Sequence, residues 1–188
     1  MTRIIAGFAG SLTLVTPGAG TRPTSDRVRE AIFSALDARG ALEAANVLDL
    51  YAGSGALGLE AASRGAARVT LVERSQQAVA ACKKNAAAVL KHAPAGLAID
   101  VLGKPVDTFL TSNTALWDVV FLDPPYDFDE AEVTDSLELL VPRLGTGAVV
   151  MLERSSRSPE PSWPAGIQLD RRKDYGDTTL WWASPNSL

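Results

Sequence analysis

Cysteine and histidine are almost absent from this chain, whose 188 residues include one of each, Cys82 and His92. A single cysteine cannot form an intramolecular disulfide, and one cysteine with one histidine falls short of the ligands that a structural zinc site needs. A lone histidine also gives little basis for a serine–histidine–aspartate triad. We therefore expect no disulfide framework and no metal, and a reducing, cytoplasmic location.

Long hydrophobic runs are also missing, since no stretch approaches the roughly 20 consecutive apolar residues that a membrane-spanning helix requires. The composition is otherwise ordinary, with 46% hydrophobic and 21% charged residues. That balance is typical of a globular chain and excludes a disordered or collagen-like one. The length is that of one domain, so we expect a single core, no membrane association and a monomer.

An excess of positive charge is absent as well, because the net charge is −4. Proteins that coat nucleic acid nonspecifically depend on Lys and Arg to neutralise phosphates, so this balance argues against that class. The charges are unevenly distributed: residues 100–153 contain eleven acidic side chains against two basic ones, whereas residues 1–40 and 154–173 are net positive. A polyanion would have to approach through these two positive stretches.

Apolar patterning predicts strands that alternate with helices from residue 46 onward. The expected strands cover residues 46–50, 68–73, 97–102, 117–122 and 148–152, and the expected helices cover residues 56–64, 75–90, 106–110 and 129–140. Strands separated by helices form right-handed crossovers, which give a parallel sheet covered on both faces. We therefore predict an α/β fold with a doubly wound, Rossmann-like sheet.

The two ends of the chain differ from this alternation. Residues 3–6 and 12–16 flank a glycine-rich turn, which predicts a small β-hairpin extension over residues 1–21. A helix capped by Thr24 or Ser25 then opens the main domain, residues 22–188. Near the other end, residues 168–174 and 178–183 flank a Tyr-Gly-Asp turn, which predicts an antiparallel hairpin.

The first expected strand of the main domain runs into a glycine-rich turn. Gly53, Gly55 and Gly58 fit the dinucleotide-binding pattern, and Glu73 ends the next strand, where an acidic residue binds ribose hydroxyls. Asp49 stands at the strand end, where its charge would oppose a pyrophosphate and would favour a cofactor with a cationic amino-acid end. S-adenosylmethionine has such an end, although an NAD-dependent dehydrogenase remains an alternative.

A second motif, Asp123-Pro124-Pro125-Tyr126, follows the strand expected over residues 117–122. The carboxyl ends of parallel strands beside a switch point form the ligand crevice, so this segment should face the glycine-rich turn. Two prolines give a stiff loop. Asp123 and the Pro124 carbonyl can accept the two hydrogens of an exocyclic amine and direct its lone pair at a methyl carbon, while Tyr126 can stack on the base.

On these two motifs, with the Arg-Pro-Thr-Ser-Asp segment at residues 22–26 and the closing Tyr-Gly-Asp-Thr, the chain resembles the RsmD family of small-subunit ribosomal RNA guanine-N2 methyltransferases. The resemblance implies a seven-stranded, mostly parallel sheet. It implies S-adenosylmethionine as donor, S-adenosylhomocysteine as product, and the N2 of a guanine in 16S rRNA as acceptor, within an assembled or assembling small subunit.

The site residues that we predict fall into three groups. The catalytic residues are Asp123, Pro124, Pro125 and Tyr126, and the cofactor-binding residues are Thr24, Asp49, Tyr51, Ala52, Gly53, Gly55, Glu73 and Arg74. The RNA-binding residues are two basic clusters, Arg22, Arg27 and Arg29, then Arg171, Arg172 and Lys173. Many relatives of this fold have an acid after the third strand for the adenine amine, but this sequence has Gly103-Lys104-Pro105 there, so Asp107 stays unassigned.

Three other functions remain open from the sequence. An adenine-N6 methyltransferase acting on DNA or RNA shares the Asp-Pro-Pro-Tyr motif, but such enzymes usually carry an additional base-reading domain, for which 188 residues leave no space. An NAD-dependent dehydrogenase would bind NAD and not S-adenosylmethionine. A noncatalytic RNA-binding module would bind RNA without cofactor turnover, and the acidic block at residues 100–153 disfavours it.

Overall fold

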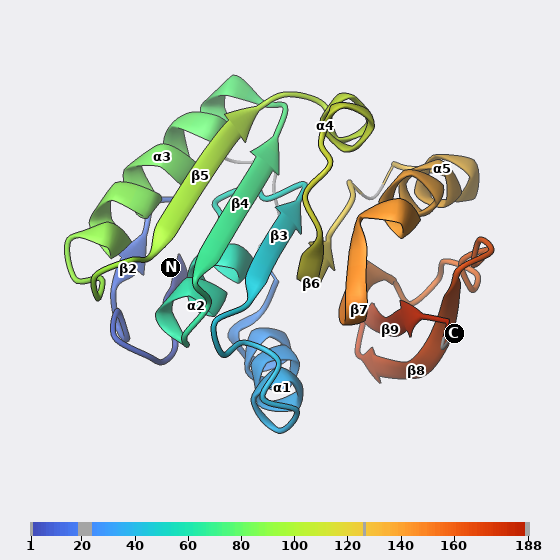
Figure 1. Ribbon diagram of the computed structural model, residues 1–188, viewed down its shortest axis with the longest axis horizontal. Helices are drawn as coiled ribbons and strands as arrows, with labels where there is room; N and C mark the ends of the chain where they lie inside the picture. Colours follow the sequence, from blue (N-terminus) through green and yellow to red (C-terminus); the bar gives the residue numbers. More distant parts are fainter. Residues whose placement is uncertain (1, 19–23, 126, 187–188) are drawn as a thin grey trace.

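The computed structural model describes residues 2–18, 24–125 and 127–186. Its main sheet contains seven strands, in chain order β3 (Asn46–Leu50), β4 (Arg68–Glu73), β5 (Ala98–Gly103), β6 (Trp117–Leu122), β7 (Leu144–Ser155), β8 (Ile167–Tyr175) and β9 (Thr178–Pro185). Their spatial order is β5-β4-β3-β6-β7-β9-β8 (Figure 1). In this spatial order the first five strands, β5, β4, β3, β6 and β7, are parallel to one another. Strand β9 runs antiparallel to both β7 and β8.

The predicted α/β fold and the closing hairpin are therefore confirmed. The strand order reverses between β3 and β6, which makes this the switch point where ligands bind in open parallel sheets. One strand prediction was too short, because β7 begins at Leu144 and not at residue 148. The glycines at 145 and 147 hid its beginning, since glycine weakens the strand signal without preventing pairing.

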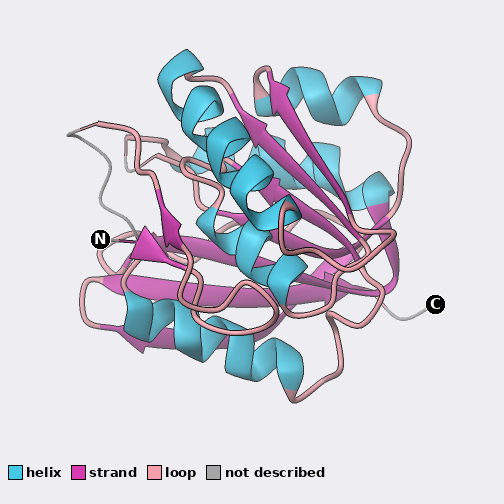
Figure 2. Cartoon of the chain, turned by 90° about the vertical axis from the view of Figure 1, so that its left-hand side faces the viewer, coloured by secondary structure: helices cyan, strands magenta, loops and turns pink. Residues whose placement is uncertain are grey.

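Among the described residues, five α-helices cover the two faces of the sheet (Figure 2). One face packs against α1 (Asp26–Asp37), α2 (Ala56–Ser63) and α3 (Gln76–Leu90), and the other packs against α4 (Val106–Ser112) and α5 (Glu130–Leu140). Alternate strand residues point to opposite faces, so Phe121 belongs to the first core and Leu122 to the second. This alternation decides which strand-end side chains share a face.

Helix starts follow the predicted capping chemistry. The Ser25 hydroxyl accepts from the Val28 N–H and caps α1, so Thr24, the other candidate, is left for a different contact. Ser75 caps α3 through the Ala78 N–H. Within the described residues, no helix combines the length and the apolar character needed to cross a bilayer.

The N-terminal hairpin is shorter than predicted. Its strands, β1 (Thr2–Arg3) and β2 (Thr13–Leu14), have two residues each, whereas we expected residues 3–6 and 12–16. The reason is that side chains of α2 take up the next backbone groups: the buried Glu60 carboxylate accepts from the N–H groups of residues 5 and 6. Ile4 and Leu14 belong to the same core as the first face of the sheet.

Candidate active site

Four carboxylates stand at the carboxyl ends of four neighbouring parallel strands. They are Glu73 on β4, Asp49 on β3, Asp123 after β6 and Glu153 on β7 (strands in Figure 1). Asp49 pairs in register with Leu71 and with Phe121, so Glu73 and Asp123 each lie two residues beyond a partner of Asp49. A spacing of two residues keeps a side chain on the same face. The topology thus collects one row of acids under α1, α2 and α3.

Beside this row lies a cleft of about 910 Å³. Its walls come from five parts of the chain: residues 2 and 16–18 of the N-terminal segment, Thr24 with Arg29, the turn between β3 and α2, the start of α3, and the proline loop after β6. Such a volume is in the range of cofactor and small-ligand sites. The cleft sits at the switch point between β3 and β6.

The glycine-rich turn has the backbone that a close-approaching ligand needs. Gly53 and Gly55 have φ of +58° and +79°, and Tyr51, a residue for which this region is strained, has φ of +62°. At Gly58 the helix approaches the sheet so closely that a Cβ would lie 2.4 Å from Leu71 Cδ2. Residues 51–54 line the cleft together with Ala56 and Leu57 at the start of α2, where a helix can offer N–H groups to a ligand.

Asp49 is a buried acid with one hydrogen-bond donor. It is 2% exposed, and its Oδ2 accepts from the Gly58 N–H at 2.8 Å. Burial raises the pKa of this carboxyl to about 7 and the charge of Glu73 adds to the rise, although the Gly58 hydrogen bond opposes it. The charged side chain that acts on Asp49 is thus a second acid, so this part of the site favours a positively charged ligand.

The Glu73 carboxylate, at the end of β4, hydrogen-bonds the glycine-rich turn. One carboxylate oxygen accepts from the Gly53 N–H at 2.9 Å, and the other accepts from the Ser75 N–H at 2.8 Å. Each oxygen has a second acceptor position, and the side chain is half-buried at the cleft wall. Two adjacent hydroxyls, such as those of a ribose, fit this acceptor.

Asp123 belongs to a second acidic pair. The Thr24 hydroxyl donates to Glu153 Oε2 at 3.0 Å and also interacts with the Asp123 carboxyl. The pKa of Asp123 is raised well above its usual value, first by burial and then by the charges of Glu153 and Asp49, and the Thr24 hydrogen bond lowers it. Pro124 and Pro125 follow as the stiff loop that the sequence predicts; Tyr126 lies outside the described residues.

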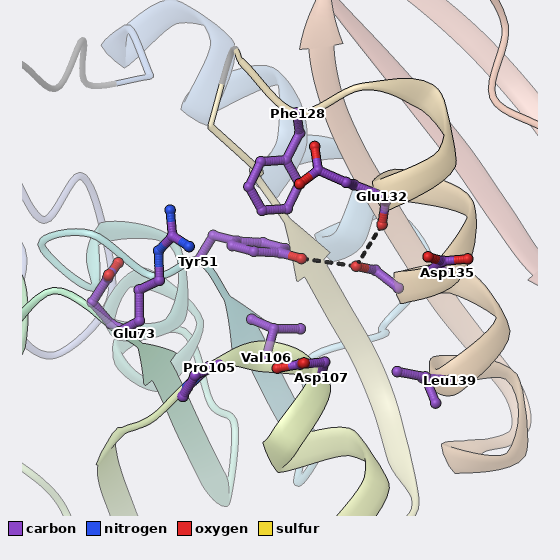
Figure 3. A pocket seen from close by; sticks show the side chains of 11 residues that line it. Tyr51, Glu73, Pro105, Val106, Asp107, Phe128, Glu132, Asp135 and Leu139 are labelled. Carbon is purple, nitrogen blue, oxygen red and sulfur yellow. Dashed lines mark hydrogen bonds between the residues drawn. The ribbon is translucent and has the colours of Figure 1, made fainter.

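A smaller cavity of about 290 Å³ adjoins the cleft (Figure 3). Tyr51, Glu73 and Arg74 line both spaces. The Tyr51 ring makes an edge contact with Phe128 at a centroid distance of 5.3 Å, and its hydroxyl hydrogen-bonds Ser136 at 2.8 Å. The cavity therefore has a rigid aromatic wall. The residues that complete it come from β5–α4 and α5 and include Pro105, Val106, Asp107, Glu132, Asp135 and Leu139.

The structure brings most of the predicted cofactor and catalytic residues to this one place. The residues that line the cleft together are Thr24, Asp49, Tyr51, Ala52, Gly53, Glu73, Arg74, Asp123, Pro124 and Pro125. Gly55 lies below the surface, against the side chains of Leu71 and Leu59. Cys82, interpreted from the sequence as a packing residue, donates its thiol to the Gly53 carbonyl at 3.1 Å.

The predicted RNA-binding residues separate into two environments. Arg27, Arg171, Arg172 and Lys173 are exposed, the last three on the edge strand β8. Arg29 is instead fully buried. Its guanidinium donates to the Arg3 carbonyl at 2.8 Å and to Asp26 at 2.6 Å, which offsets the loss of contact with water. Its position is in the cleft wall and not on the outer surface. Arg22 lies outside the described residues.

Sequence reasoning missed Glu153 and the cavity wall on α5. Glu153 is 6% exposed, and its strand pairs with β6 so that Leu152 lies opposite Leu122. The sequence did contain a signal, because each of two apolar stretches is followed by an acid whose side chain points to the same face of the sheet. Knowledge of the pairing between these strands would have placed Asp123 and Glu153 side by side. Phe128 and Ser136 carried no such signal, because only packing brings α5 over the end of β3.

Comparison with known proteins identifies the family. A family model described as conserved hypothetical protein 95 matches residues 2–184. The Escherichia coli (strain K12) protein named ribosomal RNA small subunit methyltransferase D is 36% identical over 177 residues, which cover 93% of this chain and 85% of that protein. The chain belongs to the RsmD family.

Solved structures agree with membership of the RsmD family. The Escherichia coli protein yhhF has a TM-score of 0.84 at 35% identity, covering 99% of this chain and 98% of that one. Magnesium protoporphyrin IX methyltransferase from Synechocystis PCC 6803, solved with bound S-adenosylmethionine, has a TM-score of 0.67 at 15% identity, covering 89% and 87%. At that identity the likeness concerns the fold alone, which this RsmD-family chain shares with a cofactor-bound methyltransferase.

Proposed function

We propose that this chain transfers a methyl group from S-adenosyl-L-methionine to the exocyclic N2 of a guanine in 16S ribosomal RNA. The observation that carries the proposal is the position of Asp123, which stands beside a stiff proline loop on a cleft that also contains Asp49 and Glu73. Family membership supports it, because the Escherichia coli relative is named a ribosomal RNA small subunit methyltransferase.

The cleft fits the proposed cofactor by charge. Asp49 is a buried acid whose pKa is raised by burial and by the charge of Glu73, so a ligand ammonium would relieve the cost of its ionisation. Glu73 would accept from the ribose hydroxyls, and Tyr51, Pro105, Val106 and Phe128 would enclose the adenine in the smaller cavity. When bound, S-adenosylmethionine supplies an electrophilic methyl group on a sulfonium.

The residues after β6 would orient the base. Asp123 and the Pro124 carbonyl are acceptors, and an exocyclic amine has two hydrogens to donate. These two hydrogen bonds would turn the amine so that its lone pair is no longer delocalised into the ring and can attack the methyl carbon. The Asp123 carboxylate would also stabilise the positive charge that develops on the nitrogen. The chain would gain further rate by holding the reacting atoms in line at about 3–3.5 Å.

A basic edge would hold the RNA. Lys173 pairs in register with Leu180, which pairs with Glu153, so Lys173 lies at the level of the acid row, two strands away. Arg171, Arg172 and Lys173 are exposed there and can contact phosphates, as can Arg27. We propose 16S rRNA in the small subunit or its assembly intermediate as the partner, and a monomer as the acting form.

The decisive experiment is methyl transfer from tritiated S-adenosylmethionine to small subunits that lack the modification, followed by nucleoside analysis. N2-methylguanosine is the expected product. N6-methyladenosine would instead support the adenine-N6 alternative, and no transfer with binding of NAD would support the dehydrogenase.

Replacement of Asp123 by Asn tests the catalytic assignment. We expect kcat to fall by about 10²-fold or more, because the acceptor for the developing positive charge loses its own charge. Calorimetry should show that the variant still binds S-adenosylmethionine. Asp100→Asn, which neutralises an exposed acid on β5, is the matched control. Near wild-type turnover by the Asp123 variant would remove this residue from the mechanism.

A further inference from the structure

We propose that Glu153 is a positioning residue for the methyl-transfer reaction, which acts on Asp123 through the Thr24 hydroxyl and through its own charge. The inference rests on the proposed function in one respect, namely that Asp123 is the acid that faces the target amine. It adds a second carboxylate to the site and assigns a role to Thr24 other than cofactor binding.

The placement of Glu153 follows from strand register. Leu122 on β6 lies opposite Leu152 on β7, so Asp123 and Glu153 are the next residues on two neighbouring parallel strands. Strands in such a pair are about 4.8 Å apart. Both side chains point to the face covered by α1, since Phe121 and Met151, two residues earlier on each strand, belong to that core.

A single hydroxyl connects the two acids. Thr24 donates to Glu153 Oε2 at 3.0 Å and interacts with Asp123, whereas the neighbouring Ser25 is used to cap α1. Because Glu153 is only 6% exposed, water screens its charge poorly and the effect on Asp123 is strong. The one hydroxyl therefore stands between the two carboxyls.

Other charged groups near Asp123 lie on β3, on α1 and on the segment after the proline loop. Asp49 on β3 raises the proton affinity of Asp123, as Glu153 does. Arg29 on α1 lines the same cleft but is bound to Asp26, and Asp127 lies on the same wall after the proline loop. Among the groups that act on Asp123, the largest charge effect is that of Glu153.

The chemical consequence concerns one proton. In the proposed reaction an N–C bond forms while the bond from the methyl to the sulfonium breaks, and the electron pair stays on sulfur as S-adenosylhomocysteine leaves. The methylated nitrogen must then lose a proton to return to neutrality, so an N–H bond breaks and an O–H bond forms on the Asp123 carboxylate. The carboxylate becomes a carboxylic acid, which later releases the proton to water. A neighbouring negative charge makes the Asp123 carboxylate a better proton acceptor.

The test is the pH profile of kcat at saturating S-adenosylmethionine, which keeps cofactor binding from limiting the rate. The acid limb reports ionisation of Asp123. Glu153→Gln keeps an oxygen that accepts from Thr24 but removes the charge, so the limb should move about one pH unit toward acid. One unit below the wild-type midpoint, the variant should then retain about fivefold more of its own plateau rate than wild type does. Thr24→Val removes the hydrogen bond and should move the limb in the opposite direction.

Two controls keep the proposal falsifiable. Glu138→Gln neutralises an exposed acid on α5, on the opposite face, and should leave the limb in place. Glu153→Asp keeps the charge and should restore a limb close to that of wild type. A carbon-13 NMR titration of the Asp123 carboxyl, assigned with Asp123→Asn, gives the same shift without any substrate and remains informative if the RNA target is different.

The proposal is overturned if Glu153→Gln folds and its limb and Asp123 titration coincide with those of wild type. It is also overturned if activity falls equally at every pH, which would indicate a structural role alone. If Glu153→Gln does not fold, Thr24→Val decides by the same measurements, and a limb and an Asp123 titration that coincide with those of wild type overturn the proposal. Failure of wild-type protein to methylate guanine N2 would refute the proposed function and would leave the Asp123 titration to judge Glu153.

Discussion

At the scale of single residues, Asp49 shows how burial prepares a site for a charged ligand. Its carboxyl is 2% exposed and its pKa is about 7, so near neutral pH it is partly protonated in the free protein. A bound ammonium favours the ionised form and lowers the pKa again. Cofactor binding near neutral pH should therefore release a proton, and the affinity should depend on pH.

We predict that S-adenosylmethionine binds about tenfold more tightly at pH 8 than at pH 6. The sign follows from the raised pKa of Asp49: below pH 7 the carboxyl must first lose its proton, and this cost disappears as the pH rises. Calorimetry in buffers of different ionisation enthalpy measures both affinity and proton release. Asp49→Asn should bind weakly with a flat profile, whereas an unchanged profile in this variant would assign the pH dependence elsewhere.

At the scale of elements, the start of α2 depends on a contact with the sheet that leaves no room for a side chain. A Cβ at Gly58 would lie 2.4 Å from Leu71 Cδ2 and 3.0 Å from Val69 Cγ1. The helix must therefore sit directly on β3 and β4, and this position brings the Gly58 N–H to Asp49. The third glycine of the sequence pattern thus serves helix packing, while the first two form the turn.

Gly58→Ala should destabilise the fold by about 1–3 kcal/mol, because the added methyl forces α2 away from the sheet. Thermal unfolding should show a melting temperature several degrees lower. Gly103→Ala is a suitable control, since its Cβ would meet Val79 at an ordinary 3.5 Å and the expected change is below about 0.5 kcal/mol. Equal melting temperatures for the two variants would show that α2 can shift without cost.

Asn85 connects two other elements of the cleft. From α3, its side chain exchanges hydrogen bonds with the N–H and carbonyl of Val15 and also donates to the Ser54 carbonyl, each at 2.8 Å. It is 2% exposed, so these bonds are shielded from water. The N-terminal segment and the glycine-rich turn, both of which contribute residues to the cleft wall, are therefore held together by one amide.

Asn85→Ala should cost about 1–3 kcal/mol, because it leaves buried backbone groups unpaired. We expect faster hydrogen exchange at the Val15 amide and a severalfold weaker affinity for S-adenosylmethionine, measured by NMR and calorimetry. Asn113→Ala provides the control, since Asn113 accepts from Ala115 in an exposed turn after α4. Unchanged exchange at Val15 would contradict the connection.

At the scale of the whole molecule, the acid row and a cluster of cations lie on different strands of the sheet. The net charge is −4, yet the edge strand β8 carries the exposed cations Arg171, Arg172 and Lys173, of which Arg172 forms an ion pair with Asp174 on the same strand. Figure 1 places β8 at one end of the sheet and α3 at the other. Under the proposed function, the acid row would repel RNA and this edge would attract it, which would restrict the orientation of the RNA.

Replacing Arg171, Arg172 and Lys173 together by Gln should weaken rRNA binding and reduce the slope of log K against log salt by up to about two. Binding of S-adenosylmethionine should not change. Lys83→Gln with Lys84→Gln, which removes exposed charge from α3, serves as the comparison. An unaltered salt slope in the β8 variant would place the RNA on another surface.

Much of this architecture was predictable from local sequence. The alternation of strands and helices, the glycine-rich turn and the two strand-end acids Asp49 and Asp123 follow from period, turn chemistry and motif spacing, all of which act over a few residues. The shortened N-terminal strands did not follow, because Glu60 lies 55 residues away from the backbone that it binds. The burial of Arg29 was missed for the same reason, since its carbonyl partner is Arg3.

The sequence by itself determined the parts of this protein that depend on neighbours along the chain: the element types, the glycine-rich turn, and the acids that stand at the ends of the strands. Only the tertiary structure decided that Glu153 stands beside Asp123, that Asn85 joins the N-terminal segment to the glycine-rich turn, and that α5 completes the smaller cavity. The physical reason is that strand register and helix packing are set by burial across the whole sheet, which no local pattern encodes.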